Sequence, residues 1–351
     1  MFLELTLIRW IPANIRLIGY FSNLVLLASF FGMGIGLLWH SSRRRLFPWM
    51  PAALLLLLLV VASFRVDINV ASPNAVFFKG LGDHDLPVVD PVAILPMLFF
   101  LISAVFVIVG QEFGRLFSHL PALVAYTWDI AGSLSGIVLF TLSAWLSTPA
   151  WIWFIIIVLV YLWLLNKRKH TALVPALLAG FAVILLTYLA SRNSIWSPYY
   201  KINVQHMLTG YNVDVNNISN QYVTHWENKE GFYRLPYQSF RDNTFKKILV
   251  IGSGTGSDVA VALALDPTVE HIDAVEIDPS VADLGRKLNP DRPYDDPRVR
   301  LIITDGRNYL GLGRAFVRDG ASLILRTYGA SGYTTAVTDP TSGSFDPRYT
   351  A

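Results

Sequence analysis

Three glycines and two carboxylates in the C-terminal part of the chain have the residue types and spacing of a nucleoside-binding site. Gly252, Gly254 and Gly256 follow a hydrophobic run, and Glu276 lies twenty residues after the last of them. Glycine lacks a Cβ, so the chain can turn sharply there and a ligand can approach the backbone. A carboxylate such as Glu276, at the end of the next strand, can accept hydrogen bonds from ribose hydroxyls. Asp305 follows a third hydrophobic run and is placed to meet an adenine amino group.

The order of residues in this glycine loop favours a cationic nucleoside over a dinucleotide. A pyrophosphate binder usually shows G-x-G-x-x-G running into a helix, whereas this loop reads G-x-G-x-G and continues with Ser257 and Asp258. An acid so close to the start of a helix disfavours a phosphate and suits an amino-bearing or sulfonium ligand. We therefore expect S-adenosylmethionine or its decarboxylated form rather than NAD. The expected donor-binding residues also include Asp258 itself, Ser253, Ile277 and Gly306.

The elements that position these residues read as a doubly wound, Rossmann-like α/β domain of the methyltransferase type. The expected strands are 245–251, 272–276 and 299–303, with a helix over 259–265 and a candidate fourth strand at 322–325. A strand, glycine loop, helix and strand at this spacing form a βαβ unit of a parallel sheet, which binds ligands at the carboxyl ends of its strands. The alternative is a tight turn flanked by surface charges.

A small antiparallel β layer is expected just before this domain. Residues 200–204 and 211–215 alternate with period two and are joined by a Thr209-Gly210 turn signal, and 221–224 can add a third strand. His206 and His225 in this segment have no clustered partners, so surface or layer positions suit them better than a metal site. The chain has no cysteine, and no metal is expected.

The first 195 residues have a different composition, which predicts a membrane domain. The chain is 53% hydrophobic and only 15% charged, and most of its charges follow residue 195. Six apolar stretches approach the length that a helix needs to cross a bilayer. They are Leu17–Trp39, Pro48–Phe64, Val92–Gly110, Gly132–Thr148, Ala150–Leu165 and Ala172–Ala190. The apolar segment Met1–Arg9 can be the stub of a further helix, and 111–129 is expected to be a hydrated interfacial loop. The alternative is that Glu112 and Asp129 lie at membrane depth and mark an ion or substrate path.

The expected membrane orientation rests on two signals that conflict. Basic runs at 43–45 and 167–169 mark two loops as cytoplasmic, and a sixth crossing then places the C-terminal part outside. The expected nucleoside is made and kept inside cells, which favours a cytoplasmic C-terminal domain on a bacterial inner (plasma) membrane. The C-terminal part is slightly acidic, so nucleic acid is not an expected partner. A lipid bilayer and a homo-oligomer are the expected macromolecular associations.

The C-terminal motifs closely resemble the spermidine synthase (polyamine aminopropyltransferase) family. The runs ILVIGSGTGSDVAVAL, HIDAVEIDPSVADLGRKLNP and DDPRVRLIITDGRNYL are similar to that family's VLVIGGGDGG-like loop, VEIDP, DPRV and DG motifs. The runs GQEFGRLF and AYTWDIAGSLSGI resemble its membrane-fused branch, so the resemblance extends from about Phe2 to Leu310.

This resemblance implies roles for individual residues of the chain. Glu276 would hold the ribose, Asp305 and Gly306 the adenine, and the loop 252–256 the sulfonium chain. The β layer would shape the polyamine side, with Gln221 and Tyr200 as candidate substrate-binding residues.

One departure from the family concerns the donor. Thr255 stands where the family's loop has an aspartate, which favours an amine-tailed donor and repels the carboxylate of intact S-adenosylmethionine. Repulsion between two charges at ~4 Å is worth about 1–4 kcal/mol, depending on the effective dielectric. Its loss would open the site to the intact donor. Asp258 either replaces the missing aspartate or caps the helix.

A second departure leaves the catalytic residues unassigned. The family's fourth strand ends in an acidic motif that accepts a proton from the attacking amine, but here residues 322–325 run into Arg326-Thr327-Tyr328-Gly329. The family pattern is lost after Leu310, so a truncated or frame-shifted product is expected. Its Rossmann-like domain would be incomplete and its end disordered.

The expected organisation is a membrane domain at 1–195, a β connector at 196–244, an incomplete Rossmann-like domain at 245–326 and a disordered tail at 327–351. The leading functional prediction is aminopropyl transfer from decarboxylated S-adenosylmethionine to a polyamine such as putrescine, with turnover in doubt because the acidic motif is missing. The first alternative is an S-adenosylmethionine-dependent methyltransferase. The second is a polyamine transporter or sensor with a nucleoside-binding domain.

Overall fold

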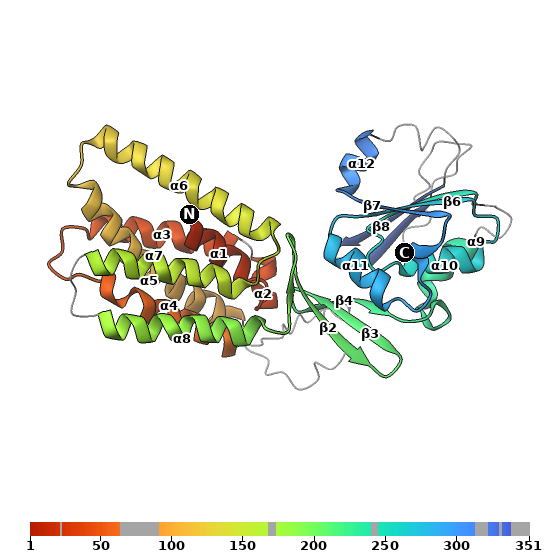
Figure 1. Cartoon of the computed structure of the whole chain (residues 1–351), viewed down its shortest axis with the longest axis horizontal. Helices are drawn as coiled ribbons and strands as arrows, with labels where there is room; N and C mark the ends of the chain where they lie inside the picture. The colour runs from red at the N-terminus through yellow and green to blue at the C-terminus, as the bar shows by residue number, and fades with distance from the viewer. Residues whose placement is uncertain are drawn as a thin grey trace. The chain divides into compact units, whose positions relative to one another are not determined.

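The chain divides into two compact units, which are described separately (Figure 1). The computed structural model describes residues 1–21, 23–63, 91–167, 173–239, 245–312, 322–329 and 332–337. Among the described residues, the helical unit holds those up to 203 together with 215–218, and the C-terminal unit holds 204–214 and those from 219 onwards. The four-stranded sheet described below contributes residues to both.

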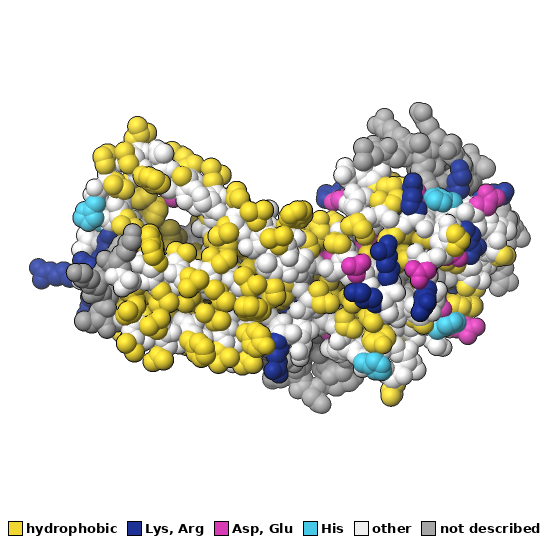
Figure 2. All heavy atoms as spheres, in the orientation of Figure 1, with side chains coloured by type: hydrophobic (Ala, Val, Ile, Leu, Met, Phe, Trp, Pro, Cys, Tyr) yellow, Lys and Arg dark blue, Asp and Glu magenta, His cyan; other side chains and the backbone are white. Residues whose placement is uncertain are grey.

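The helical unit is a bundle of apolar helices (Figure 1). Its described helices are α1 (Phe2–Trp10), α2 (Arg16–Tyr20), α3 (Asn23–Leu38), η1 (Phe47–Trp49), α4 (Met50–Ser63), α5 (Pro91–Phe117), α6 (Ala122–Trp145), α7 (Ala150–Lys167) and α8 (Leu173–Ser191). Within the part of the chain that the structure describes, three spans are long and apolar enough to cross a membrane by length and composition: Ala93–Phe117, Ala122–Trp145 and Leu173–Ser191. The apolar helices Asn23–Leu38, Phe47–Ser63 and Ala150–Asn166 are shorter. All six lie where the sequence predicts apolar stretches, and yellow hydrophobic side chains cover much of the unit in Figure 2.

Glycines allow α3 and α5 to approach to backbone contact. A Cβ added at Gly32 would lie 2.3 Å from the carbonyl oxygen of Ser103, and one at Gly110 would lie 2.6 Å from that of Met33. The Ser103 hydroxyl also donates to the carbonyl of Ala28 at 3.0 Å. Small residues such as these allow the backbones of two apolar helices to pack closely against each other.

The expectation of a loop over 111–129 is wrong. Helix α5 continues to Phe117 and α6 begins at Ala122, so Gln111 and Asp129 are both helical. The reason is a long-range contact, because the buried Gln111 amide accepts from the Leu46 amide at 3.0 Å and donates to the Arg44 carbonyl at 3.1 Å. Because its polar groups have these partners, Gln111 can be buried within a helix, although a polar residue after an apolar stretch suggests that the helix ends. The segment Met1–Arg9, the expected stub, is helical as α1.

The β layer expected before the Rossmann-like domain is a four-stranded sheet in the order β1-β2-β3-β4. Its strands are β1 (Ile195–Trp196), β2 (Lys201–Met207), β3 (Gly210–Val215) and β4 (Ile218–Val223). The turn between β2 and β3 includes Thr209, whose carbonyl accepts from the Thr224 hydroxyl at 2.8 Å. Short helical turns follow, at η4 (Trp226–Asn228), η5 (Gly231–Arg234) and α9 (Leu235–Ser239).

The remaining strands form a doubly wound sheet in the order β7-β6-β5-β8-β9, which confirms the predicted α/β class. The strands are β5 (Lys247–Ile251), β6 (His271–Glu276), β7 (Val299–Ile303), β8 (Ser322–Gly329) and β9 (Gly332–Val337). The pairs β5–β6, β6–β7 and β5–β8 are parallel. The helices are α10 (Ser257–Leu265), α11 (Pro279–Leu288) and α12 (Gly306–Leu312), with η6 (Pro293–Asp295) before β7. Ile248, Val250, Val259, Ile272 and Ala274 lie in the core.

Part of the segment expected to be a disordered tail is a strand. Residues 332–337 form β9, which pairs antiparallel with β8 from Ile324↔Val337 to Gly329↔Gly332. Its sequence, Gly-Tyr-Thr-Thr-Ala-Val, is rich in aromatic and β-branched residues, which favour strands. Of the other residues in 327–351, residues 327–329 belong to strand β8 (Ser322–Gly329), whereas 330–331 and 338–351 lie outside the described residues.

The buried carboxylate of Asp273 on β6 links this strand to the neighbouring strand β7 and to helix α12. Asp273 is fully buried and accepts two hydrogen bonds from Arg300 on β7, at 2.7 and 2.8 Å, and one from the Tyr309 hydroxyl of α12, at 2.5 Å. His271 Nε2 lies 3.0 Å from the same carboxylate. Burial acts to raise the pKa of Asp273, but these hydrogen bonds outweigh it and hold that pKa below its usual range.

We predict that Asp273→Asn destabilises the β6–β7 region by about 3 kcal/mol at neutral pH, because Arg300 and Tyr309 lose a charged acceptor. Hydrogen exchange of β6 and β7 peptides in the full chain measures this. Because the folded pKa is depressed, the stabilisation is complete above the ordinary aspartate pKa of about 3.9 and is lost as pH falls through the folded value. Variant and wild type should therefore converge in strong acid. Glu270→Gln, which removes an exposed pair with Lys246, is the control and should change nothing measurable.

Candidate functional site

The glycine loop after β5 depends on three left-handed backbone positions. Gly252, Gly254 and Gly256 have φ values of 73°, 57° and 85°, which side-chain-bearing residues rarely adopt. The amides of Gly252 and Ser253 both donate to the carbonyl of Val275 on β6, at 2.8 and 3.0 Å. The loop is therefore folded back against the carboxyl end of the neighbouring strand. Helix α10 begins directly after it, with Gly256 as its N-cap.

Glu276, at the carboxyl end of β6, is bonded directly to this loop. One carboxylate oxygen accepts from the Gly254 amide at 2.8 Å, and the other accepts from the Asp278 amide at 2.9 Å. Burial raises the pKa of Glu276, although the amides of Asp278, Gly254 and Ile277 act against that shift. Each carboxylate oxygen can accept a further hydrogen bond. The geometry therefore leaves capacity for ligand hydroxyls next to the glycine loop.

Gln221, in the second half of β4, contacts the same loop. Its amide oxygen accepts from the Thr255 amide and from the Thr255 hydroxyl, both at 2.8 Å. A Cβ added at Gly254 would lie 2.1 Å from Gln221 Nε2, so the amide group covers that glycine. Thr255 itself is fully buried. The structure thus joins a predicted substrate-side residue to the predicted donor loop.

Tyr294 in η6 supports the loop from another side. Its hydroxyl lies 3.0 Å from Ser253 Oγ and donates to the Gly254 carbonyl at 2.8 Å. Burial is the main cause that raises the pKa of Tyr294 well above its usual range, and the negative charges of Glu276 and Asp258 add to it. The tyrosine therefore stays protonated and keeps donating to the loop.

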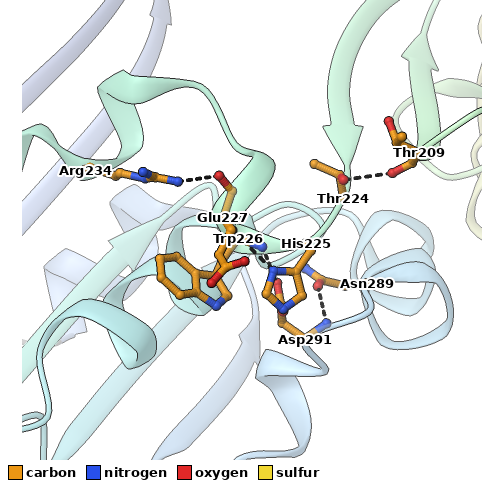
Figure 3. Close-up of polar contacts among 8 residues, drawn as sticks. All are labelled: Thr209, Thr224, His225, Trp226, Glu227, Arg234, Asn289 and Asp291. Carbon is orange, nitrogen blue, oxygen red and sulfur yellow. Dashed lines mark hydrogen bonds and ion pairs between the residues drawn. The ribbon is translucent and has the colours of Figure 1, made fainter.

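A polar chain connects the loop to the segment that follows β4 (Figure 3). Asn289 donates to the Thr255 carbonyl at 2.9 Å and accepts from the Asp291 amide at 3.0 Å. The Asp291 carboxylate accepts from the Trp226 amide at 2.8 Å and lies 3.1 Å from His225 Nε2. Figure 3 also shows Arg234 directed at the Glu227 carbonyl and Thr224 at that of Thr209. The segment around Gln221 is consequently fastened at two places, directly and through Asn289.

Asp305 and Gly306 lie beyond β7, and the Asp305 side chain is not bonded to the glycine loop in the described structure. The Thr304 amide donates to the Glu276 carbonyl at 2.9 Å, which brings the end of β7 next to that of β6. The Asp305 carboxylate instead pairs with Arg307, at 3.0 Å. A Cβ at Gly306 would lie 2.5 Å from a methyl group of Ile251, so only glycine fits that approach.

Other predicted residues occupy less central positions. Asp258 lies in the first turn of α10, but the N-cap is Gly256, so Asp258 is not the helix cap. Ile277 contributes its backbone amide beside Glu276. Tyr200 belongs to the helical unit, where its carbonyl accepts from the Ser197 amide at 2.9 Å. Among the described residues, no group of three His, Cys, Asp or Glu side chains has the spacing of a metal site.

Sequence reasoning missed three residues that hold the loop: Tyr294, Asn289 and Asp291. The dipeptide Asn289-Pro290 marks the end of a helix, and the Asp291 that follows is typical of a turn. Such signals predict the turn but not its contact with a loop more than thirty residues earlier in the chain.

Comparison with known proteins matches part of the chain. The spermine/spermidine synthase domain model matches residues 235–313. Putrescine N-methyltransferase 2 of Nicotiana tabacum is 42% identical over 72 residues, which is 20% of each protein. Spermidine synthase 2 of Arabidopsis thaliana is 46% identical over 67 residues, 18% of this chain and 19% of that protein. The polyamine aminopropyltransferase of Pectobacterium carotovorum is 40% identical over 68 residues, 18% of this chain and 23% of that protein.

These alignments span about a fifth of the length of the curated relatives. Among solved structures, spermidine synthase from Thermotoga maritima matches with 20% identity and a TM-score of 0.32, over 39% of this chain and 55% of that one. The domain match and the curated relatives show that the C-terminal unit is spermidine-synthase-like in sequence around its glycine loop.

We predict that affinity for the expected adenosyl donor falls as pH drops through the raised pKa of Glu276. Only the ionised carboxylate can accept from both ribose hydroxyls while it holds the loop amides. Because burial raises that pKa, the loss should begin above the ordinary glutamate value of about 4.3. Calorimetric titration of S-adenosylmethionine across mildly acidic pH measures it. Glu276→Gln should remove this pH step and Glu270→Gln should retain it; a step unchanged in Glu276→Gln would contradict the prediction.

Proposed function

We propose that the C-terminal unit is a transferase domain that binds an adenosyl sulfonium donor and acts on a polyamine. The observation that supports this best is the bonding of Glu276 to the Gly254 amide at 2.8 Å, because it places a carboxylate with free acceptor capacity at a loop that a ligand can approach. The domain match over 235–313 includes both residues. The parallel strand order places them at the carboxyl ends of neighbouring strands.

Aminopropyl transfer from decarboxylated S-adenosylmethionine to an amine such as putrescine is the first candidate reaction. The matched synthase domain favours it. The sequence has no carboxylate between residues 322 and 338, where the family's acidic motif is expected. An attacking ammonium must lose its proton to a base. We therefore propose donor binding as the property of this site and treat turnover as the question for experiment.

Methyl transfer from intact S-adenosylmethionine is the second candidate. An uncharged Thr255 stands in the loop, so no aspartate there repels the donor's carboxylate. Several similar curated proteins are putrescine N-methyltransferases, including the one from Nicotiana tabacum.

Incubating the full chain with putrescine and each donor in turn distinguishes the two reactions, because mass spectrometry resolves an added aminopropyl group from an added methyl group. Glu276→Ala should weaken donor binding by about 1–3 kcal/mol through loss of charged hydrogen bonds. Glu270→Ala is the exposed control. If neither donor binds the wild-type chain, or if Glu276→Ala leaves affinity unchanged, the proposed site is wrong.

We also propose that the helical unit is an integral membrane domain. Large apolar side chains are exposed on its helices, among them Phe30 (61%), Phe100 (63%), Trp128 (69%) and Phe181 (65%). Exposed apolar area on this scale marks a surface that another apolar phase or partner covers. Bilayer lipid suits spans such as Ala122–Trp145, of which only 11% is buried.

In our proposal, the place where the donor is made decides on which side of the membrane the donor site lies. Arg115 of α5 donates to the His40 carbonyl at 3.0 Å, and Tyr161 of α7 to the Phe47 carbonyl at 3.3 Å. The ends of α3, α5 and α7 therefore meet at the loop that carries the arginines 43–45, and α8 starts from that end (Figure 1). The positive-inside rule favours a cytoplasmic arginine loop. We place the end of α8 and the donor site in the cytoplasm instead, because the donor is made there.

The chain has no cysteine, so single-cysteine variants test this topology directly. We expect the membrane fraction to retain the chain in alkaline carbonate. In intact bacterial spheroplasts, an impermeant maleimide should label Ser41→Cys and should label Leu208→Cys only after permeabilisation. Leu208 is fully exposed in the turn after β2, which makes it a suitable reporter. The reverse labelling pattern would place the donor site outside, and release by carbonate would contradict the membrane domain.

A further inference from the structure

We infer that the loop between α3 and η1, residues 39–46, binds the headgroups of anionic phospholipids through the exposed guanidinium groups of Arg43, Arg44 and Arg45. We call this segment the arginine loop. The inference rests on the proposed membrane domain and deepens it by naming the class of lipid that this part of the bundle prefers. It is independent of the donor site in the C-terminal unit.

The arginine loop carries positive charge that its surroundings do not neutralise. Arginines 43–45 are exposed, and none of their side chains forms an ion pair or a hydrogen bond with another residue that the structure describes. The sequence has no Asp or Glu within residues 5–66. Helix α5, which contacts the loop, adds the cation Arg115 and the buried Glu112. Figure 2 shows dark blue side chains projecting from one end of the helical unit. The loop therefore offers three adjacent cations to an anionic partner.

Hydrogen bonds from α5 fix the backbone of the arginine loop without using its arginine side chains. Arg115 donates to the carbonyls of His40 and Arg44, at 3.0 and 3.2 Å. Gln111 donates to the same Arg44 carbonyl at 3.1 Å and accepts from the Leu46 amide at 3.0 Å. The backbone is therefore already ordered, and a ligand has only the arginine side chains to order when it binds. Removing their charge should leave the fold of the loop intact.

Two exposed tryptophans indicate that the arginine loop lies at the level of lipid headgroups. Trp39, directly after α3, is 56% exposed, and Trp49, in η1, is 67% exposed. Tryptophan concentrates at membrane–water interfaces, because its ring is apolar and its N–H is polar. Guanidinium groups between two such anchors can reach lipid phosphates and bind them bidentately. A zwitterionic headgroup carries its own cation, so an anionic phospholipid suits three arginines better.

Lipid binding gives these arginines a role on either side of the membrane. In our proposed topology the arginine loop is outside the cytoplasm, where the positive-inside rule does not account for it. Contact with anionic headgroups requires only that such lipids are present in the leaflet that the loop meets. The inference therefore stands or falls separately from the orientation of the chain.

The test places one fluorophore in the arginine loop of the full chain, at Ser41→Cys, which is exposed and is the only cysteine of that variant. The chain is reconstituted in vesicles of phosphatidylcholine and phosphatidylglycerol, and a quencher is carried on the acyl chain of one lipid or the other at equal mole fraction. We expect phosphatidylglycerol to associate with the loop about tenfold or more tightly than phosphatidylcholine at low salt. High salt should reduce this preference by screening. Changing arginines 43–45 to Gln together should abolish it.

Two controls show whether the arginine loop itself is responsible. A fluorophore at Leu146→Cys, exposed just after α6 at the other end of that helix from its connection to α5, should report no preference (Figure 1). Changing three exposed cations of the C-terminal unit, Arg286, Lys287 and Arg292, to Gln should leave the preference at Ser41→Cys unchanged.

Three results would overturn the inference while the membrane domain stands. They are equal quenching by the two lipids at Ser41→Cys, a preference that survives the change of arginines 43–45 to Gln, and the same preference at Leu146→Cys. Loss of the preference in the C-terminal control would overturn it as well, because net charge would then be the cause. A chain that does not insert into the vesicles would overturn the proposed membrane domain itself.

Discussion

The glycine loop after β5 is held by side chains that satisfy its backbone, and the candidate site depends on this constraint. A loop with three left-handed glycines has little side-chain packing of its own, so its polar backbone groups must find partners elsewhere. Glu276 takes the Gly254 amide, Gln221 takes the Thr255 amide, and Asn289 donates to the Thr255 carbonyl. Partners from three separate segments thereby become parts of one site.

The same constraint explains why the segment after β4 carries so many polar contacts. Gln221 bonds to Thr255 from within β4, so this contact needs the strand to be held next to the glycine loop. The Asp291 carboxylate, bonded to the Trp226 amide and facing His225, fixes the chain just after that strand. Because Asp291 also donates its amide to Asn289, one short turn secures both the glycine loop and the residue that covers it. The position of Gln221 relative to the glycine loop therefore depends on all of these hydrogen bonds together.

Local patterns in the sequence predict the parallel sheet, its glycine loop and Glu276, because strand periodicity and loop spacing are short-range features. Long-range partners are harder to predict. The polarity of Gln111 suggests the end of a helix, yet its amide bonds lie with Leu46 and Arg44, and α5 continues past it. Tyr294 looks like an ordinary turn residue until the fold brings it to Gly254. Thr255 is an intermediate case, since the sequence shows that it differs from the family's aspartate but only the structure shows that its amide and hydroxyl both bond to Gln221.

The contact of Asp305 with Arg307 in the structure is compatible with the predicted contact of Asp305 with an adenine amino group. Its carboxylate pairs with Arg307, whose side chain is 92% exposed, so water screens that pair and little stability depends on it. An adenine amino group could take over one carboxylate oxygen while Arg307 turns into solvent. The bonds of Glu276 are buried and are not exchanged so readily. For the proposed donor site, we therefore expect the predicted ribose contact at Glu276 to be formed before a donor arrives, and the predicted adenine contact at Asp305 to adjust when it binds.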